Sequence, residues 1–101
     1  MPKIAITVPH TLGANEATTR IQGLLGEVKR DFGDQVTDLS ETWTGHGAEF
    51  AFRVMGMQVS GTLQIADHLV QMQGDIPFAA LPFKSRIEAM VRKRTEQLLA
   101  Q

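Results

Sequence analysis

Apolar and polar side chains alternate with a period of two over much of the chain. The first such run is residues 3–8, and Pro9 removes the backbone donor that would follow it. After Gly33 the alternation returns in four runs, at residues 37–44, 48–54, 59–65 and 69–76. Because the side chains of a half-buried strand point alternately to the two faces of a sheet, this period predicts five strands.

Short turns separate the last four runs, at residues 45–47, 55–56 and 66–67. The first two contain glycine, which adopts positive φ without steric cost and therefore suits a tight turn. We predict that the four runs form consecutive antiparallel hairpins.

Residues 12–32 follow the helical period instead. Their apolar side chains fall within an arc about 100° wide, the width of a core-facing stripe. They are Ala14, Ala17, Ile21, Leu24, Leu25, Val28 and Phe32. Gly33 should end this helix, and either Thr11 or Asn15 could cap its start.

Inside a helix, Gly23 and Gly26 each cost up to about 1 kcal/mol relative to alanine, so we expect them to pack closely against another backbone.

A second helix is predicted after Pro82, which suits a first helical turn. At 100° per residue, an apolar arc of about 100° contains Phe83, Ile87, Met90, Val91 and Leu98, and we expect it to face the core. Arg94 lies in the middle of this arc. Either its stem packs while its guanidinium reaches water beyond the helix end, or it has an ion partner in the interior.

The predicted order is therefore β-α-β-β-β-β-α in a single domain, residues 1–101. Hairpins give an antiparallel sheet with one apolar face, and two amphipathic helices are available to cover it. The expected fold class is α+β, with both helices packed on one face of the sheet.

The charge of the chain is small overall but unevenly distributed. The formal net charge is −1, yet five basic and two acidic side chains from Phe78 onward give +3 and leave −4 for the remainder. This balance predicts no general attraction to nucleic acid. The absence of cysteine, of an apolar run near 18 residues and of a signal sequence leads us to expect a cytoplasmic protein without a membrane span.

No catalytic constellation is visible in the sequence. The histidines, His10, His46 and His68, are not spaced as metal ligands, and no nucleophile or phosphate-loop motif occurs. We therefore expect no metal, no cofactor and no enzymatic activity.

Two off-pattern charges suggest a ligand pocket. Glu41 lies between Leu39 and Trp43 in strand phase, so a face that is otherwise apolar carries a carboxylate. If the helices cover that face, Glu41 and Arg94 could meet and, with Trp43, line the polar end of a pocket. Alternatively a β-bulge or an edge position leaves Glu41 in water, and Trp43 belongs to the core or its rim.

The segment IPFAALPF joins the last strand to the second helix. It contains four large apolar side chains and two prolines, too interrupted for a strand or a regular helix. Some of these side chains should fill the edge of the core. Others, flanked by basic residues, could protrude as a contact for an apolar, anionic-coated surface or a partner. The candidate contact residues are Phe78, Leu81, Phe83, Lys84 and Arg86.

Several short motifs resemble one family over nearly the whole chain. They occur within PHTLGANEA, ETWTGHGAEFAF, MGMQVSGTLQI, IPFAALPFKSRIEAMV and a closing LL. The most specific are His10 with Leu12-Gly13, Trp43 with Gly45, Gly61 with Leu63, and Pro82-Phe83-Lys84 before Ile87-Glu88. Together they resemble the polyhydroxyalkanoic acid system proteins, small bacterial proteins linked to polyester storage granules. The resemblance implies a role in polyhydroxyalkanoate metabolism or at granules, and it brings no catalytic residue set.

The order of elements is also similar to a reduced helix-grip fold, whose larger members hold apolar ligands between the sheet and a C-terminal helix. Two functions therefore compete. One is a noncatalytic accessory protein that touches the granule surface or a granule protein. The other is a carrier or sensor of a small apolar ligand such as a hydroxyacyl chain. An enclosed, partly apolar cavity of about 300 Å³ or more favours the carrier. The sequence also allows a homodimer formed through an edge strand such as residues 3–8, although nothing in it requires one.

Overall fold

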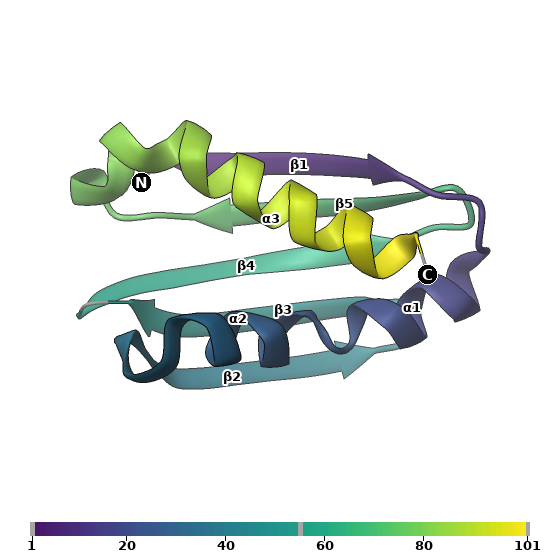
Figure 1. Ribbon diagram of the computed structural model, residues 1–101, viewed down its shortest axis with the longest axis horizontal. Helices are drawn as coiled ribbons and strands as arrows, with labels where there is room; N and C mark the ends of the chain where they lie inside the picture. Colours follow the sequence, from purple (N-terminus) through teal and green to yellow (C-terminus); the bar gives the residue numbers. More distant parts are fainter. Residues whose placement is uncertain (1, 55, 101) are drawn as a thin grey trace.

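Five antiparallel strands form one sheet in the order β1-β5-β4-β3-β2, and helices cover one of its faces (Figure 1). The computed structural model describes residues 2–54 and 56–100, and for Phe32 the backbone only. The strands are β1 (Lys3–Pro9), β2 (Val36–Thr44), β3 (Gly47–Val54), β4 (Met57–Ile65) and β5 (Leu69–Asp75). The helices are α1 (Ala14–Ile21), α2 (Leu24–Phe32) and α3 (Lys84–Leu99), with short 3₁₀ helices η1 (Gly33–Gln35) and η2 (Phe78–Phe83). The expected α+β class and antiparallel sheet are confirmed.

The register brings the apolar positions of all five strands onto one face. One row across the sheet runs from β1 to β2 through Ile6, Met72, Leu63, Ala48 and Trp43. The first four are buried and Trp43 is half-buried against them. The alternate positions carry mainly threonine, glutamine and serine and lie on the uncovered face. A register shift of one residue would exchange these two faces, so the alternation in the sequence fixes the pairing.

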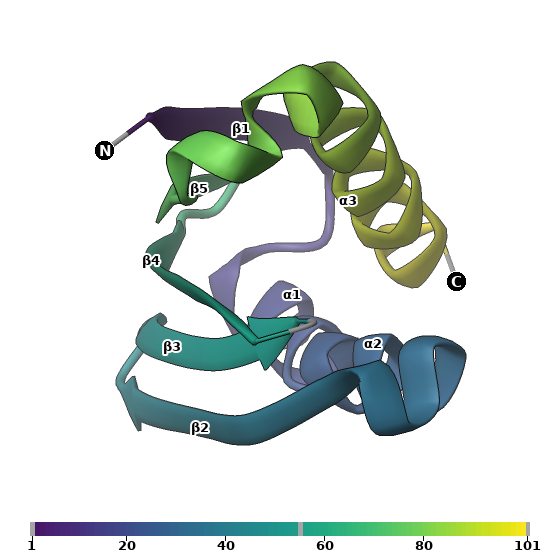
Figure 2. The ribbon, with the colours of Figure 1, turned by 90° about the vertical axis from the view of Figure 1, so that its left-hand side faces the viewer.

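A glycine pair lies in the next row of the sheet. Gly61 of β4 pairs with Gly74 of β5, Phe50 pairs with Gly61, and Ile4 pairs with Gly74. A Cβ atom on Gly61 would meet the Gln73 carbonyl and lie 2.8 Å from Phe50 Cζ. Ile4 and Phe50 therefore occupy the space above the two glycines. Figure 2 shows the sheet curled around the helices, with β4 between its two halves.

The predicted helix over residues 12–32 is two helices, because the chain turns at Gln22 and Gly23. The Gly23 N–H donates to the Arg20 carbonyl at 3.3 Å, in place of a regular helical bond. The expected close packing of the two helical glycines is wrong. A Cβ on Gly23 would meet only the Arg20 carbonyl oxygen, three residues earlier in the chain, at 3.7 Å, and one on Gly26 would meet nothing within 4 Å. Gly33 ends α2 with φ of +55°, as expected.

The start of α1 is capped by a residue far away in the sequence. Neither Thr11 nor Asn15 caps the helix, since Gly13 holds the N-cap position. The Ala14 N–H instead donates to Asp67 Oδ1 at 3.0 Å, and Asp67 lies in the turn between β4 and β5. A carboxylate at this position satisfies a helical N–H and complements the helix dipole.

The buried face of α3 is rotated from the predicted one. Thr95 is fully buried and Leu99 is nearly so, whereas Phe83 and Met90 are exposed. Two side chains of α3 bind the outer edge of β1. Arg92 Nη1 donates to the Thr7 carbonyl at 3.1 Å, and Glu88 accepts from the Ala5 N–H at 3.5 Å.

Thr95 tolerates full burial because its hydroxyl is satisfied within its own helix. Thr95 Oγ1 donates to the Val91 carbonyl at 2.8 Å. A pattern of apolar residues counts threonine as polar, so the predicted face includes Val91 and Leu98, which do pack against the core, but misses Thr95.

The predicted turns agree with the strand ends. Thr44 pairs with Gly47, so Gly45 and His46 form a two-residue turn in which Gly45 has φ of +59°. Gly56 has φ of +79°, which suits the turn expected after β3. Met55, the other residue of that turn, lies outside the described residues.

Candidate attachment surface

The segment IPFAALPF both anchors to the core and projects from it. Ile76 is buried, and its N–H donates to the Pro2 carbonyl at 3.0 Å. The chain then forms η2, in which Ala80 is buried and its N–H donates to the Pro77 carbonyl at 2.9 Å. These contacts hold the segment at the edge formed by β1 and β5, at the end of the molecule where α3 begins (Figure 1, green).

Three large apolar side chains of η2 point to solvent. Phe78 is 71% exposed, Phe83 is 53% exposed and Leu81 is 47% exposed. A 3₁₀ helix has three residues per turn, so Phe78 and Leu81 lie on the same side, one above the other. Ile76 and Ala80 therefore fill the edge of the core, and the other three large apolar side chains are exposed.

The charges beside these side chains are predominantly basic. Lys84 and Arg86 follow η2 directly, and neither forms an ion pair within the part of the chain that the structure describes. The nearby acids are engaged elsewhere, since Asp75 pairs with Lys3 at 3.8 Å and Glu88 accepts from β1. An apolar surface with a cationic border results. We call Phe78, Leu81, Phe83, Lys84 and Arg86 the η2 patch.

Glu41 and Trp43 lie on the covered face of the sheet but at its edge. Glu41 pairs with Phe50 and Trp43 with Ala48, in the last strand of the sheet. The register of β2 shifts at a bulge between Thr37 and Ser40, and Glu41 is exposed. The second of our two interpretations of Glu41, a bulge or an edge position, is the one that the structure shows.

The proposed contact between Glu41 and Arg94 does not form. Arg94 makes an ion pair with Asp31 of α2, and the two side chains are 38% and 35% exposed. This pair joins α2 to α3 at the surface of the molecule. Arg94 is off-pattern in the sequence, but nothing in the sequence identifies Asp31 as its partner, because the pair depends on how the two helices cross.

Two depressions formed by the described residues are open to solvent. One has a volume of about 520 Å³ and lies beside the start of α1. It is lined by Leu12, Gly13, Ala14, Asn15, Glu16, His46 and Asp67. The other, about 290 Å³, lies on α3 and is lined by Met90, Lys93, Arg94 and Gln97. Neither is the enclosed apolar cavity that a ligand carrier needs.

Two polar atoms in the interior lack a hydrogen-bond partner among the described residues. They are Thr18 Oγ1 on α1 and Trp43 Nε1 on β2. Each is buried, and buried polar groups in folded proteins are normally paired. Nearby, the Asn15 side chain joins the first turn of α1 to the turn after β2, with its Oδ1 2.7 Å from His46 Nε2.

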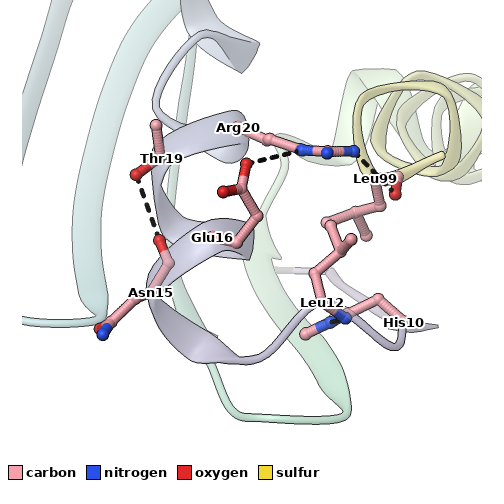
Figure 3. Close-up of polar contacts among 7 residues, drawn as sticks. All are labelled: His10, Leu12, Asn15, Glu16, Thr19, Arg20 and Leu99. Carbon is pink, nitrogen blue, oxygen red and sulfur yellow. Dashed lines mark hydrogen bonds and ion pairs between the residues drawn. The ribbon is translucent and has the colours of Figure 1, made fainter. Parts of the chain in front are cut away.

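His10 has a structural role in the loop between β1 and α1. The Leu12 N–H donates to its Nδ1 at 3.1 Å, as Figure 3 shows. Its Nε2 lies 2.9 Å from the Ala66 carbonyl and must therefore carry the proton. The imidazole thus ties this loop to the turn between β4 and β5. No group of three or more metal-ligating side chains is found among residues 2–54 and 56–100.

The opposite end of α3 is fixed by Arg20 of α1. Arg20 Nε donates to Glu16 Oε2 at 3.0 Å, and its Nη1 donates to the Leu99 carbonyl at 3.3 Å (Figure 3). A cation at a helix C-terminus satisfies an unpaired carbonyl and complements the dipole. Together with Arg92 and Glu88, this contact sets which side of α3 faces outward.

Among the described helices, none is both long and apolar enough to span a bilayer.

Comparison with known proteins gives a fold and a family. None of the curated proteins matches the chain significantly. The protein superposes on the crystal structure of Ara h 8.0201 with a TM-score of 0.51. The alignment covers 99% of each chain, and the two sequences are 7% identical. At this identity the similarity shows the fold alone, and it confirms the expected likeness to the helix-grip class. The family described as "Putative polyhydroxyalkanoic acid system protein" matches residues 4–99. This chain therefore belongs to the polyhydroxyalkanoic acid system protein family.

Proposed function

We propose that this protein is a noncatalytic accessory protein of polyhydroxyalkanoate storage, which attaches to the granule surface or to a granule protein through the η2 patch. It would act in the cytoplasm, without a cofactor. The observation that carries the proposal is the joint exposure of Phe78, Leu81 and Phe83 on one short helix that the core holds in place. Large apolar side chains gathered on a surface are typical of an interaction site.

The patch supports weak, reversible attachment. Full burial of a Phe or Leu side chain contributes about 1.5–3 kcal/mol, so three roughly half-exposed ones contribute on the order of 3–5 kcal/mol. Association costs roughly 4–15 kcal/mol in lost freedom of motion. Additional basic contacts or several linked copies are therefore needed for stable binding.

The proposal predicts that Phe78→Ser combined with Leu81→Ser lowers cosedimentation of the protein with isolated granules. The expected effect is at least tenfold weaker binding, because most of the exposed apolar area is removed. Leu39→Ser is the matched control, since Leu39 is another exposed leucine on a distant edge strand. Circular dichroism should show that all variants stay folded. Undiminished cosedimentation of the folded double variant would refute attachment through this patch.

The second candidate function is that of a small-ligand carrier or sensor, with Trp43 at the polar end of its site. It is favoured by the buried, unpartnered atoms of Thr18 and Trp43, which a polar ligand group could satisfy. Native mass spectrometry of protein purified from a granule-forming host tests this alternative. A retained small molecule that is lost on Trp43→Phe would support the carrier, whereas a bare chain mass would argue against it.

A further inference from the structure

The outward side of α3 carries a second surface, which continues from the η2 patch. Phe83, Arg86, Met90, Lys93 and Gln97 follow one another at spacings of three and four residues. All five are exposed, including Met90 at 40%. Residues at this spacing lie along one line of a helix. We call this line the outer stripe.

The outer stripe combines apolar and cationic side chains. Phe83 and Met90 alternate with Arg86 and Lys93 over eleven residues, a rise of about 15 Å at 1.5 Å per residue. Phe83 and Arg86 belong to the η2 patch as well, so the two surfaces form one continuous area. The depression beside Met90 and Lys93 lies on the same line.

Three of the other charged residues of α3 are engaged elsewhere, whereas Glu96 is exposed three residues after Lys93. Arg94 pairs with Asp31, and Arg92 and Glu88 bind the edge of β1. Arg86 and Lys93 form no ion pair within the described ranges. The helix therefore presents unpaired cations outward, although the whole chain has a formal net charge of −1. Residues before Phe78 carry the compensating negative charge, so an anionic surface would orient the molecule with α3 toward it.

From this arrangement we infer that the outer stripe binds anionic phospholipid headgroups, with α3 lying flat in the interface. A helix in this position buries apolar side chains at the boundary between headgroups and acyl chains while its cations contact phosphates. The inference deepens the proposed function, because it names anionic phospholipid as the surface that the η2 patch and the stripe recognise together. The polar, uncovered face of the sheet would then point away from the lipid.

Vesicle flotation tests the inference directly. We expect the protein to float with phosphatidylglycerol–phosphatidylcholine vesicles at low salt and to bind pure phosphatidylcholine at least tenfold more weakly. Each cation near an anionic surface contributes about a fivefold change in binding, so Arg86→Gln with Lys93→Gln should weaken binding about 25-fold. Arg53→Gln is the control because Arg53 belongs to β3 on the uncovered face. Equal binding to both vesicle types, unaffected by removal of the two cations, would overturn the inference.

The absence of cysteine allows a second, positional test. Met90→Cys and Thr62→Cys variants would each carry one environment-sensitive fluorophore. Thr62 lies on the uncovered face of the sheet. Anionic vesicles should shift the emission of the label at position 90 to the blue and leave that at position 62 unchanged. Equal responses at both positions would overturn the flat orientation of α3.

The outcomes separate this inference from the proposed function. If vesicles fail to bind while granule cosedimentation still depends on Phe78 and Leu81, the lipid inference falls and the attachment proposal stands. If granules bind only while their protein coat is intact, the partner is a protein and the lipid inference is wrong. If vesicle binding does not depend on Arg86 and Lys93, and granule cosedimentation does not depend on Phe78 and Leu81, both the lipid inference and the attachment proposal are refuted.

Discussion

At the scale of single residues, the absence of one atom decides how strands β4 and β5 approach. Gly61 has no Cβ, and the Phe50 ring and the Gln73 carbonyl occupy the space where one would lie. Glycine normally weakens a strand, so its presence here reflects crowding rather than flexibility. Gly26 is the opposite case, because its surroundings are open.

We predict that Gly61→Ala lowers the free energy of unfolding by about 1–3 kcal/mol, since the added methyl group must displace an aromatic ring or backbone. Gly26→Ala should instead raise it by up to about 1 kcal/mol, through helix propensity alone. Urea unfolding followed by circular dichroism measures both. A neutral Gly61→Ala would show that Phe50 and the β5 backbone can move without cost.

At the scale of elements, polar contacts along one side of α3 and at its C-terminal end help to fix its position. Glu88 and Arg92 hydrogen-bond the outer edge of β1, and Arg20 caps the C-terminus of α3. The edge of β1 that we considered for dimer formation is thus partly occupied by α3. The opposite edge strand, β2, is the more open one for pairing with a second copy.

The ion pair between Arg94 and Asp31 should contribute little to stability. Half-exposed ion pairs are typically worth less than about 1 kcal/mol. In a double-mutant cycle, Arg94→Met and Asp31→Asn should therefore couple by about 0.5–1 kcal/mol in the free energy of unfolding. Arg94→Met and Glu41→Gln should be additive, because Glu41 lies on the distant edge strand. Coupling of several kcal/mol with Glu41 would contradict the observed pairing.

At the scale of the whole molecule, the chain has a polar face, a covered core and one apolar, basic side. The threonine, glutamine and serine side chains of the sheet lie on the uncovered face. The helix α3, which carries the outer stripe, lies on the other side of the sheet (Figure 2). Such a molecule can rest on a surface in one orientation. Because the expected affinity of a single copy is low, attachment should be reversible and should depend on salt.

The fold could be predicted from the sequence to a large extent. Alternation with period two located five strands, glycines located the turns, and the two helical stretches were found, because each of these signals is local. The motifs PHTLGANEA and IPFAALPFKSRIEAMV also indicated the family, which the match over residues 4–99 confirms. Exposure of part of the η2 segment was one of the two expectations for IPFAALPF.

The candidate surface could be predicted only in part, because side-chain direction on a helix depends on what the helix packs against. Met90 was expected in the core, and Phe83 was expected both in the core-facing arc and among the surface-contact residues. Both side chains are exposed and belong to the outer stripe, because α3 is rotated and buries Thr95 instead.

The sequence by itself thus determined which segments become strands and helices, since hydrophobic period and turn residues act between near neighbours. Only the tertiary structure decided which side of α3 faces water, that Asp31 is the partner of Arg94, and that Asp67 caps α1. These outcomes depend on contacts between residues far apart in the chain, whose energies are small individually and leave no local pattern.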